Sequence, residues 1–373
     1  WGDVIGHRRI YIAGLGVFTF ASAACALATT LPMLAAARAL QGVGAAGLMS
    51  VQIALLRQIY PPHRLGRGVG MNALFVGIGF ALGPSVASLI LSVATWPWLF
   101  GINVPLGLIA LAAALPSLPH SPRGAHGFDA VAALLSMVAF SVLIFALGSA
   151  GQREPAWMVG GALTAALALG VVLALRERGH PSPILPIDLF RRPLFALSAL
   201  TAVGSFTTQG IAFVALPFYF EAVLHRDPVE TGFLMSPWAI VVALAAPIAG
   251  RLSDRYPPGL LGGIGLAVLS VGMVSLALLP AQPSALDISI RMAICGIGFG
   301  FFQSPNLKAL MSSAPAHRAG GASGIIATSR LLGQTSGAAL TAFCFSLAGV
   351  QGSVTALWLG AGFAALASVA TAT

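Results

Sequence analysis

Residues 259–280 read GLLGGIGLAVLSVGMVSLALLP, a stretch of twenty-two residues without a single charge. A helix rises about 1.5 Å per residue, so about 20 apolar residues cross the roughly 30 Å hydrocarbon layer of a membrane. This stretch is therefore long enough for a membrane-spanning helix. It indicates that the chain is a membrane protein.

The rest of the chain follows the same pattern. Of its 373 residues, 57% are hydrophobic and 8% are charged, with a mean hydropathy of +0.92, whereas soluble domains are about 25% charged. Apolar stretches of this length, without period-2 alternation, indicate helices rather than a β-barrel. We predict an all-α polytopic membrane protein with twelve transmembrane helices, at residues 10–29, 33–57, 69–92, 99–116, 129–148, 157–175, 194–220, 231–250, 259–280, 287–309, 320–346 and 352–373.

The 19 Lys and Arg residues are distributed unevenly between the two sets of turns. If the N-terminal turn is cytoplasmic, fourteen lie in cytoplasmic turns and two, Arg153 and Arg226, lie in outer turns. The other three, Arg38, Arg291 and Arg330, fall inside predicted helices. The positive-inside rule therefore places the N-terminal turn in the cytoplasm. This distribution accounts for the net charge of +9 without a nucleic-acid partner.

Side chains that could carry enzymatic chemistry are scattered along the chain. The seven His residues stand singly in turns, and Cys25, Cys295 and Cys344 stand singly in apolar stretches. The sequence therefore shows no metal-ligand cluster, no nucleophile–base set and no disulfide framework. We predict that the protein is not an enzyme and has no cofactor and no metal.

Residues near the start of the chain recur about 250 positions later. Asp3 matches Asp254 at an offset of 251, and Arg38 matches Arg291 at an offset of 253. At an offset of 254 the matches are Gly44 with Gly298, Arg64 with Arg318, Gly66 with Gly320, Gly70 with Gly324, Gly79 with Gly333, and Gly83 with Gly337. Transporters are commonly built from two such repeats.

The repeat also predicts helices that the sequence does not contain. Two predicted helices precede the Asp254 turn in its half, whereas none precedes the Asp3 turn, so we expect two further helices before Trp1 and fourteen in all. The chain then divides into the remainder of an N-terminal half (1–118), an inserted helix pair (119–180) and a C-terminal six-helix half (181–373).

Four motifs fall at corresponding places in this scheme. Gly2-Asp3-Val4-Ile5-Gly6-His7-Arg8-Arg9 forms a charged turn, and Gly250-Arg251-Leu252-Ser253-Asp254-Arg255 is its weaker copy. Arg38-Ala39-Leu40-Gln41-Gly42 lies in one predicted helix, and Gly70, Gly79, Gly83 and Pro84 give the next a Gly-x3-Gly-Pro face. These motifs resemble those of the fourteen-helix drug/proton antiporter branch of the major facilitator superfamily, over essentially the whole chain.

The resemblance implies an integral protein of the bacterial cytoplasmic (inner) membrane. It would export small lipophilic drugs, antibiotics or metabolites in exchange for protons by alternating access. Its partners would be the substrate, protons and the lipid bilayer, and an accessory export subunit is left open. Conformational and coupling roles would fall to Asp3, Gly6, Arg8, Arg9, Arg38, Gly42, Gly79, Gly83, Pro84, Asp254, Arg255, Arg291 and Arg330. The substrate cavity would be lined by Gln41, Phe206, Thr208, Gln209, Phe213, Phe302, Gln303 and Asn306.

Simpler alternatives stand beside these assignments. Asp3 and Asp254 would also suit ordinary charged turns, Arg38 would reach the outer surface by extending its side chain, and Arg291 would pair with Asp287 four residues earlier. The phenylalanines would also suit core packing. No acidic residue lies deep in a predicted helix, so the proton-carrying carboxylate is expected on the first of the two absent helices. The alternative function is an uptake symporter or facilitator for a small organic solute.

Overall fold

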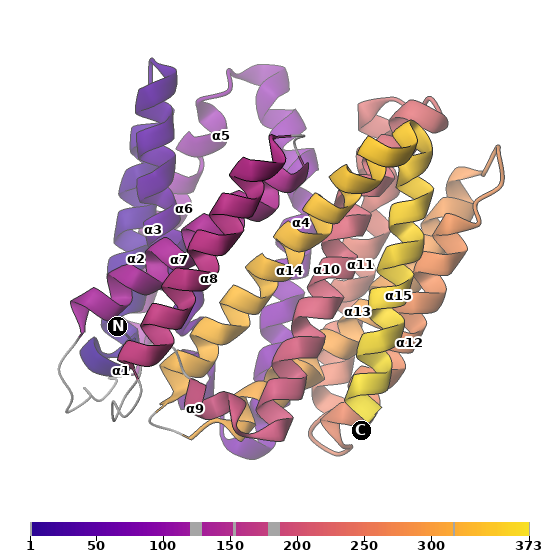
Figure 1. Cartoon of the computed structure of the whole chain (residues 1–373). Coiled ribbons are helices and arrows are strands. Elements are labelled where there is room, and N and C mark those ends of the chain that lie inside the picture. The colour runs from indigo at the N-terminus through magenta and orange to yellow at the C-terminus, as the bar shows by residue number, and fades with distance from the viewer. Residues whose placement is uncertain (1, 120–128, 152–153, 178–186, 316–317, 373) are drawn as a thin grey trace. The chain divides into compact units, whose positions relative to one another are not determined.

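The computed structural model describes residues 2–119, 129–151, 154–177, 187–315 and 318–372, and helices are the regular elements over these ranges (Figure 1). Each of the twelve predicted segments is helical. The long helices are α2 (His7–Ala26), α3 (Leu31–Ile59), α4 (Leu65–Val93), α6 (Asn103–Ser117), α7 (Ala130–Gly151), α8 (Ala156–Arg176), α10 (Pro193–Phe218), α11 (Pro228–Leu252), α12 (Pro258–Ala277), α13 (Ala285–Ser313), α14 (Ala319–Ala348) and α15 (Gly352–Ala372). The short elements are α1 (Gly2–Ile5), η1 (Pro62–Arg64), α5 (Trp98–Gly101), α9 (Ile187–Phe190), the π-helical η2 (Tyr219–Val223) and η4 (Gly349–Gln351). The prediction of an all-α fold is confirmed.

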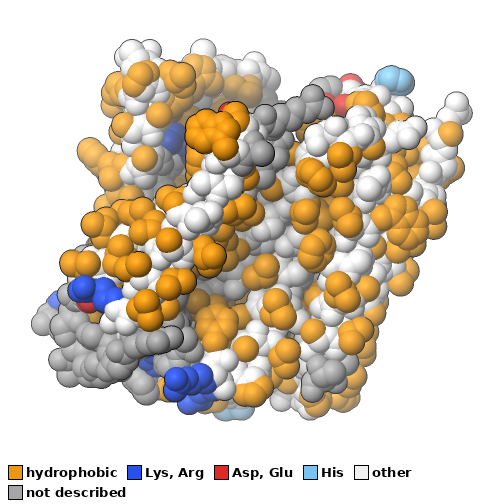
Figure 2. All heavy atoms as spheres, viewed as in Figure 1, with side chains coloured by type: hydrophobic (Ala, Val, Ile, Leu, Met, Phe, Trp, Pro, Cys, Tyr) orange, Lys and Arg blue, Asp and Glu red, His pale blue; other side chains and the backbone are white. Residues whose placement is uncertain are grey.

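The helices carry apolar side chains on their outer surfaces as well as inside. Ten stretches of the described chain are long and apolar enough to cross a membrane, the last of them containing both α14 and α15. Large apolar residues on these helices, such as Val271 and Leu366, are exposed. Figure 2 shows hydrophobic side chains spread over the visible face. A surface of this kind is stable in lipid and not in water.

The chain forms two compact units that do not follow the order of the sequence. Unit 1 contains residues 1–62, 79–128 and 314–327, and unit 2 contains residues 63–78, 129–313 and 328–373. Two helices are divided between the units. The first part of α4 belongs to unit 2 and the rest to unit 1, whereas the first part of α14 belongs to unit 1 and the rest to unit 2.

Equivalent helix crossings in the two units follow the offsets found in the sequence. In unit 1 a Cβ added to Gly14 of α2 would lie 2.9 Å from the backbone oxygen of Gly44 of α3. In unit 2 a Cβ added to Gly265 of α12 would lie 2.7 Å from the backbone oxygen of Gly298 of α13. Gly14 and Gly265 are 251 residues apart, and Gly44 and Gly298 are 254 apart. In both units glycines therefore let two helix backbones approach more closely than side chains would allow.

A second pair of contacts repeats at the same offsets. Thr19 of α2 packs against Gly107 of α6, and Ser270 of α12 donates a 2.9 Å hydrogen bond to the Ala361 carbonyl of α15. Thr19 and Ser270 are 251 residues apart, and Gly107 and Ala361 are 254 apart. The sequence repeat thus corresponds to a repeated arrangement of helices.

The helix pair α7–α8 is held at one end by Asp129. Its Oδ1 accepts hydrogen bonds of 3.0 Å from the backbone N–H groups of Val131 and Ala132, at the start of α7. Its Oδ2 lies 3.3 Å from Arg176 Nη2, at the end of α8. The Ala132 N–H and the Arg176 guanidinium lower the pKa of the Asp129 carboxyl, because both favour its charged form.

Candidate functional site

The carboxylate of Asp254 joins three segments that lie far apart in the sequence. Asp254 follows the end of α11, and its Oδ1 accepts a 3.1 Å hydrogen bond from the Gly66 backbone N–H at the start of α4. The same oxygen lies 2.6 Å from Lys308 Nζ of α13, and that ammonium also donates a 2.6 Å hydrogen bond to the Ser253 carbonyl. The ammonium and the partial positive charge at the start of α4 both stabilise the ionised carboxylate. We call Asp254, Gly66 and Lys308 the Asp254 latch.

Next to the Asp254 latch, α4 and α11 meet backbone to backbone. A Cβ added to Gly66 would collide with the backbone oxygen of Gly250, and a Cβ added to Gly70 would lie 2.8 Å from that of Ala246. The latch side chains are largely shielded from water, because that of Lys308 is 13% exposed and that of Asp254 is 16% exposed. Shielding strengthens the attraction between the two charges.

The sequence motif identifies Asp254 but not the cation that pairs with it. Arg251 and Arg255, the basic residues of the motif, are exposed, and within the described ranges their side chains form no ion pair or hydrogen bond. The coupling role of Arg255 stays a prediction. The partner is instead Lys308, the only lysine of the sequence, which lies on a different helix. A single lysine near the end of an apolar stretch is the signal that could have identified it.

The first copy of the motif occupies α1 and the start of α2. Asp3 belongs to α1, and its side chain lies outside the described residues. Gly6 separates the two helices at φ 104°, a conformation that favours glycine. Arg8 Nη2 donates a 2.6 Å hydrogen bond to the Leu115 carbonyl near the end of α6, and Arg9 is exposed. Arg8 therefore ties α2 to α6 within unit 1.

Arg38 of α3 is a cation inside a membrane-spanning helix. Its Nη1 donates a 2.6 Å hydrogen bond to Gln41 Oε1, and buried Gln41 donates a 2.7 Å hydrogen bond to Ser22 Oγ of α2. The guanidinium carbon also lies 5.5 Å from the centre of the Phe100 ring, within cation–π range. In the described part of the chain no carboxylate lies within ion-pair distance of Arg38. Gly42 is exposed, with no described atom within 4 Å of an added Cβ.

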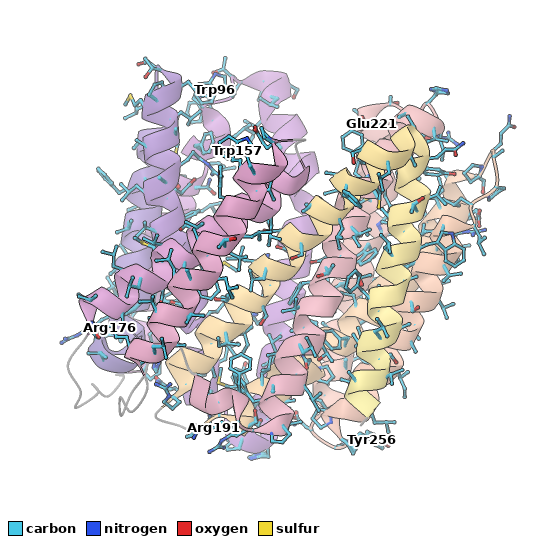
Figure 3. The ribbon with its side chains drawn as sticks, in the orientation of Figure 1. Trp96, Trp157, Arg176, Arg191, Glu221 and Tyr256 are labelled. Atoms are coloured by element: carbon cyan, nitrogen blue, oxygen red, sulfur yellow. The ribbon has the colours of Figure 1, made fainter. Side chains whose placement is uncertain are left out.

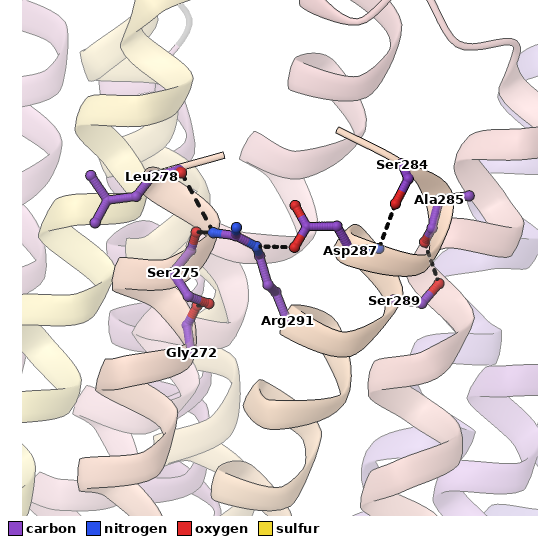
Figure 4. A network of polar contacts seen from close by, with 8 residues as sticks. All are labelled: Gly272, Ser275, Leu278, Ser284, Ala285, Asp287, Ser289 and Arg291. Carbon is purple, nitrogen blue, oxygen red and sulfur yellow. Dashed lines mark hydrogen bonds and ion pairs between the residues drawn. The ribbon is translucent and has the colours of Figure 1, made fainter. Parts of the chain in front are cut away.

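Arg291 of α13 occupies the repeat position of Arg38 but has different partners (Figure 4). Its Nε lies 2.9 Å from Asp287 Oδ1, one helical turn earlier. Its Nη1 donates hydrogen bonds to the carbonyl groups of Ser275 and Leu278 at the end of α12. The ion pair with Asp287, the simpler of the two sequence interpretations, is present. Arg291 also supplies positive charge where the α12 dipole is negative.

The glycines of α4 and α14 lie in different environments in the two repeats. In α14, a Cβ added to Gly333 would lie 2.6 Å from a carbonyl oxygen of α10, and one added to Gly337 would collide with another. Their counterparts in α4, Gly79 and Gly83, have no described atom within 4 Å of an added Cβ. Pro84 is part of the continuous helix α4, and its side chain lies outside the described residues.

The aromatic residues proposed for the substrate cavity lie mainly in the hydrophobic core of unit 2. Phe206 is 3% exposed and Phe302 is 1% exposed, and both belong to one packed cluster. The Phe206 ring lies 5.6 Å from Phe299, and the half-buried Phe213 ring lies 5.6 Å from Trp238, measured between ring centres. As cavity-lining residues they stay a prediction.

The proposed polar residues of α10 contact other helices of unit 2. Gln334 Nε2 of α14 donates a 3.0 Å hydrogen bond to Gln209 Oε1, and Thr208 Oγ1 donates a 2.9 Å bond to the Gly360 carbonyl. Gln303 of α13 is half-buried. Gln334 was not identified from the sequence, because its place opposite Gln209 depends on how α10 and α14 pack.

Two further predicted residues lie elsewhere in the fold. Asn306, near the end of α13, donates a 3.0 Å hydrogen bond from Nδ2 to the Ser198 carbonyl of α10 and borders a cavity there. Arg330 lies half-buried in α14 and has an interaction partner. The residues of the Asp254 latch contact one another, and Gln209 contacts Gln334 elsewhere in unit 2. Arg38 and Gln41 form a third group, in unit 1.

Known proteins share both this sequence and this fold. Residues 1–338 match the family described as Major Facilitator Superfamily. The chain is 46% identical over 371 residues to the uncharacterized transporter YebQ of Escherichia coli, covering 98% of this chain and 81% of YebQ. It is 28% identical to the riboflavin transporter RibZ of Clostridioides difficile, covering 92% of this chain and 75% of RibZ. It is 30% identical to the tetracenomycin C resistance and export protein of Streptomyces glaucescens, covering 91% of this chain and 64% of that protein.

The fold is also that of a solved transporter. A structure of the proton:xylose symporter XylE aligns with 99% of this chain and 80% of its own, with a TM-score of 0.66 at 16% identity. A match along residues 1–338, close identity to a transporter over most of its length and a shared helical fold all agree. This chain belongs to the Major Facilitator Superfamily, and it is an integral membrane transporter rather than an enzyme.

Proposed function

We propose that this protein exports small lipophilic compounds in exchange for protons by alternating access. The observation that carries the proposal is the Asp254 latch, in which one carboxylate holds α4 of the first repeat to α11 and α13 of the second. Because such a contact depends on one carboxylate and two donors, it can form in one conformer and break in the other at a moderate cost in free energy. The Asp254 latch thus has the properties of a gate at one end of the transport path.

The direction of transport is supported by a relative and by a motif. The tetracenomycin C protein is named for resistance and export and is 30% identical to this chain. The spacing of Gly79, Gly83 and Pro84 resembles the antiporter motif. Drug, antibiotic or metabolite efflux is therefore the function we favour.

The cargo would pass between aromatic walls that contain few polar groups. Within unit 2, Gln209 and Gln334 supply amide groups from α10 and α14. A path with few polar groups favours lipophilic molecules over sugars, because a sugar would lose water without gaining enough hydrogen bonds.

Proton exchange requires a carboxylate in the membrane, and all ten acidic residues of this sequence lie in turns or near helix ends. In the second repeat, the glycines equivalent to Gly79 and Gly83 pack on α10, whereas no described atom lies within 4 Å of a Cβ added to Gly79 or Gly83. We propose that the proton-binding group acts at this face of α4.

This arrangement corresponds to the fourteen-helix drug/proton antiporter branch. The parts would be the N-terminal half (1–118), the inserted pair (119–180) and the C-terminal half (181–373). We place the protein in the bacterial inner membrane with the N-terminal turn in the cytoplasm, because the turns on that side carry most of the arginines.

Transport into inverted membrane vesicles tests the proposal. With a pH gradient imposed, we expect a lipophilic cationic dye to accumulate, and we expect collapse of the gradient to release it. Lys308→Met, which removes the cation of the latch, should lose most of the transport, whereas Arg67→Gln, an exposed arginine beside the latch, should keep it. Dye movement that ignores the gradient would contradict proton exchange. The alternative, uptake or facilitated movement of a small organic solute, is supported by the name of RibZ and predicts movement in the opposite direction or without a gradient.

A further inference from the structure

A cavity of about 200 Å³ lies within unit 2, at the end where α10 and α12 begin and α13 and α15 end. Apolar residues such as Leu194 and small ones such as Gly259 and Gly262 form most of its wall. Ser198 and Asn306 border it as well. None of the residues that line it belongs to the Asp254 latch.

Two buried polar side chains on the wall of this cavity each have an atom without a hydrogen bond to any described residue. Ser198 is 5% exposed and Asn306 is 3% exposed. Asn306 uses Nδ2 to bond the Ser198 carbonyl, but its Oδ1 and the Ser198 hydroxyl form no hydrogen bond with any described residue. Neither atom is sealed off from the cavity. The Ser198 hydroxyl can donate a hydrogen bond, whereas the Asn306 Oδ1 can only accept one. Polar atoms in buried residues normally have a partner, so the cavity suits an occupant that offers both an acceptor and a donor.

The starts of two long helices meet at the same cavity. α10 has 26 residues and α12 has 20, and neither has a side chain bonded to its first N–H groups. Leu194 and Gly259, whose N–H groups belong to those first turns, both line the cavity. Uncapped N–H groups and the positive ends of two helix dipoles favour an anionic oxygen.

Arginines and exposed apolar residues lie close in sequence to the residues that line the cavity. Arg191 precedes α10 and Arg255 precedes α12, and both are exposed. Figure 3 shows Arg191 and Tyr256 at the ends where α10 and α12 begin. Leu194, Leu260 and Val369, from three of the four helices that border the cavity, are each more than half exposed. Positive charge and a lipid-facing apolar surface thus both occur near the cavity.

We propose that this cavity binds the phosphate headgroup of an anionic membrane lipid. A water molecule occupies about 30 Å³, so the cavity holds roughly six groups of that size, which suits a phosphate with its glycerol carbons. The acyl chains would lie outside, along the exposed apolar side chains. Basic residues close to a pocket between transmembrane helices favour such headgroups.

Thermal unfolding of the purified full chain in mixed micelles tests this proposal. Phosphatidylglycerol should raise the unfolding midpoint in a saturable way, on the order of 3 °C near saturation. Phosphatidylcholine and inorganic phosphate should each have a much smaller effect. Equal effects of the two lipids, or a full effect of inorganic phosphate with none of phosphatidylglycerol, would overturn the lipid assignment.

Variants separate this cavity from general lipid effects. In Gly262→Leu the new side chain would fill the cavity, since an added Cβ has only ordinary contacts, the nearest at 3.5 Å. The response to phosphatidylglycerol should disappear. Gly160→Leu, on α8 with no described atom near, is the matched control and should keep it.

A surface variant keeps the test decisive if Gly262→Leu does not fold. The double variant Arg191→Gln/Arg255→Gln changes exposed residues only. It should weaken the apparent affinity for phosphatidylglycerol about fivefold per arginine at low salt. An unchanged affinity in the double variant would reject the site, as would an unchanged response in folded Gly262→Leu.

Discussion

Lys308 Nζ and Asp254 Oδ1 lie 2.6 Å apart where the first turn of α4 meets α11. This ion pair breaks the internal symmetry of the chain. The residue equivalent to Lys308 in the first repeat is Ala54, which is fully buried. The two repeats therefore share helix crossings but not the chemistry at this end.

Lys308→Met should destabilise the protein and slow transport. The substitution keeps the length of the side chain and removes its charge, leaving the shielded Asp254 carboxylate with only the Gly66 N–H. We expect a loss of about 2–3 kcal/mol in the free energy of unfolding, measured by denaturant titration in detergent. In a double-mutant cycle, Asp254→Leu should destabilise the Lys308→Met variant less than it destabilises the wild type. Additive losses would show that the two groups act independently.

Gly66→Ala should disturb the same contact through shape rather than charge. The added methyl group would collide with the Gly250 backbone and approach Asp254 Oδ1 to 2.7 Å. The expected cost is roughly 1–3 kcal/mol, with reduced transport. Gly16→Ala in α2, where no described atom lies near, should be neutral or stabilising, by up to about 1 kcal/mol. A neutral Gly66→Ala variant would argue against close packing of α4 on α11.

Gly337→Leu and Gly83→Leu should have different effects although they occupy equivalent positions. In α14 the new side chain would strike the Thr207 carbonyl, so Gly337→Leu should fail to yield folded protein. In α4 the described structure leaves space, so Gly83→Leu should fold but lose transport, because this face is the proposed antiporter motif. Size-exclusion profiles and vesicle transport check the two outcomes. Normal transport by Gly83→Leu would remove Gly83 from the mechanism.

The pH dependence of stability should contain a contribution from Asp129. Its pKa is lowered in the folded protein by the Ala132 N–H and by Arg176. This contribution is therefore complete above the pKa of an unfolded Asp, about 3.9, and is lost as the pH falls through the lower folded value. Unfolding midpoints of the wild type and Asp129→Asn should differ at neutral pH and converge below about pH 4. A constant difference across this range would exclude ionisation of Asp129 as the cause.

Most of the fold follows from the sequence because each helix is determined by its own apolar residues. Residues 259–280 are long enough to span a membrane whatever they contact, and α12 is found there. Local irregularities also have local causes. Pro217, near the end of α10, removes one backbone donor, and the helix continues as the π-helical η2.

The partners of the site residues do not follow from the sequence. Lys308 pairs with Asp254 across 54 positions, and Gln334 meets Gln209 across 125. No local pattern indicates such pairs, because they depend on which faces of two helices meet. The charged turn identifies the Asp254 carboxylate, but its cation, the Lys308 ammonium, lies on α13.

Arg291 and Arg38 occupy equivalent positions, and their surroundings predict opposite phenotypes. Arg291 neutralises Asp287 and caps the end of α12, so Arg291→Met should lower the free energy of unfolding by about 1–3 kcal/mol. Transport per folded molecule should change little, because all its partners lie at one end of two packed helices. Arg38 contacts Gln41 and Phe100, which α3 and α5 would hold without it. Arg38→Met should therefore fold with near-normal stability and lose transport. Measuring both properties for both variants separates the roles, and loss of transport in stably folded Arg291→Met would assign coupling to Arg291 instead.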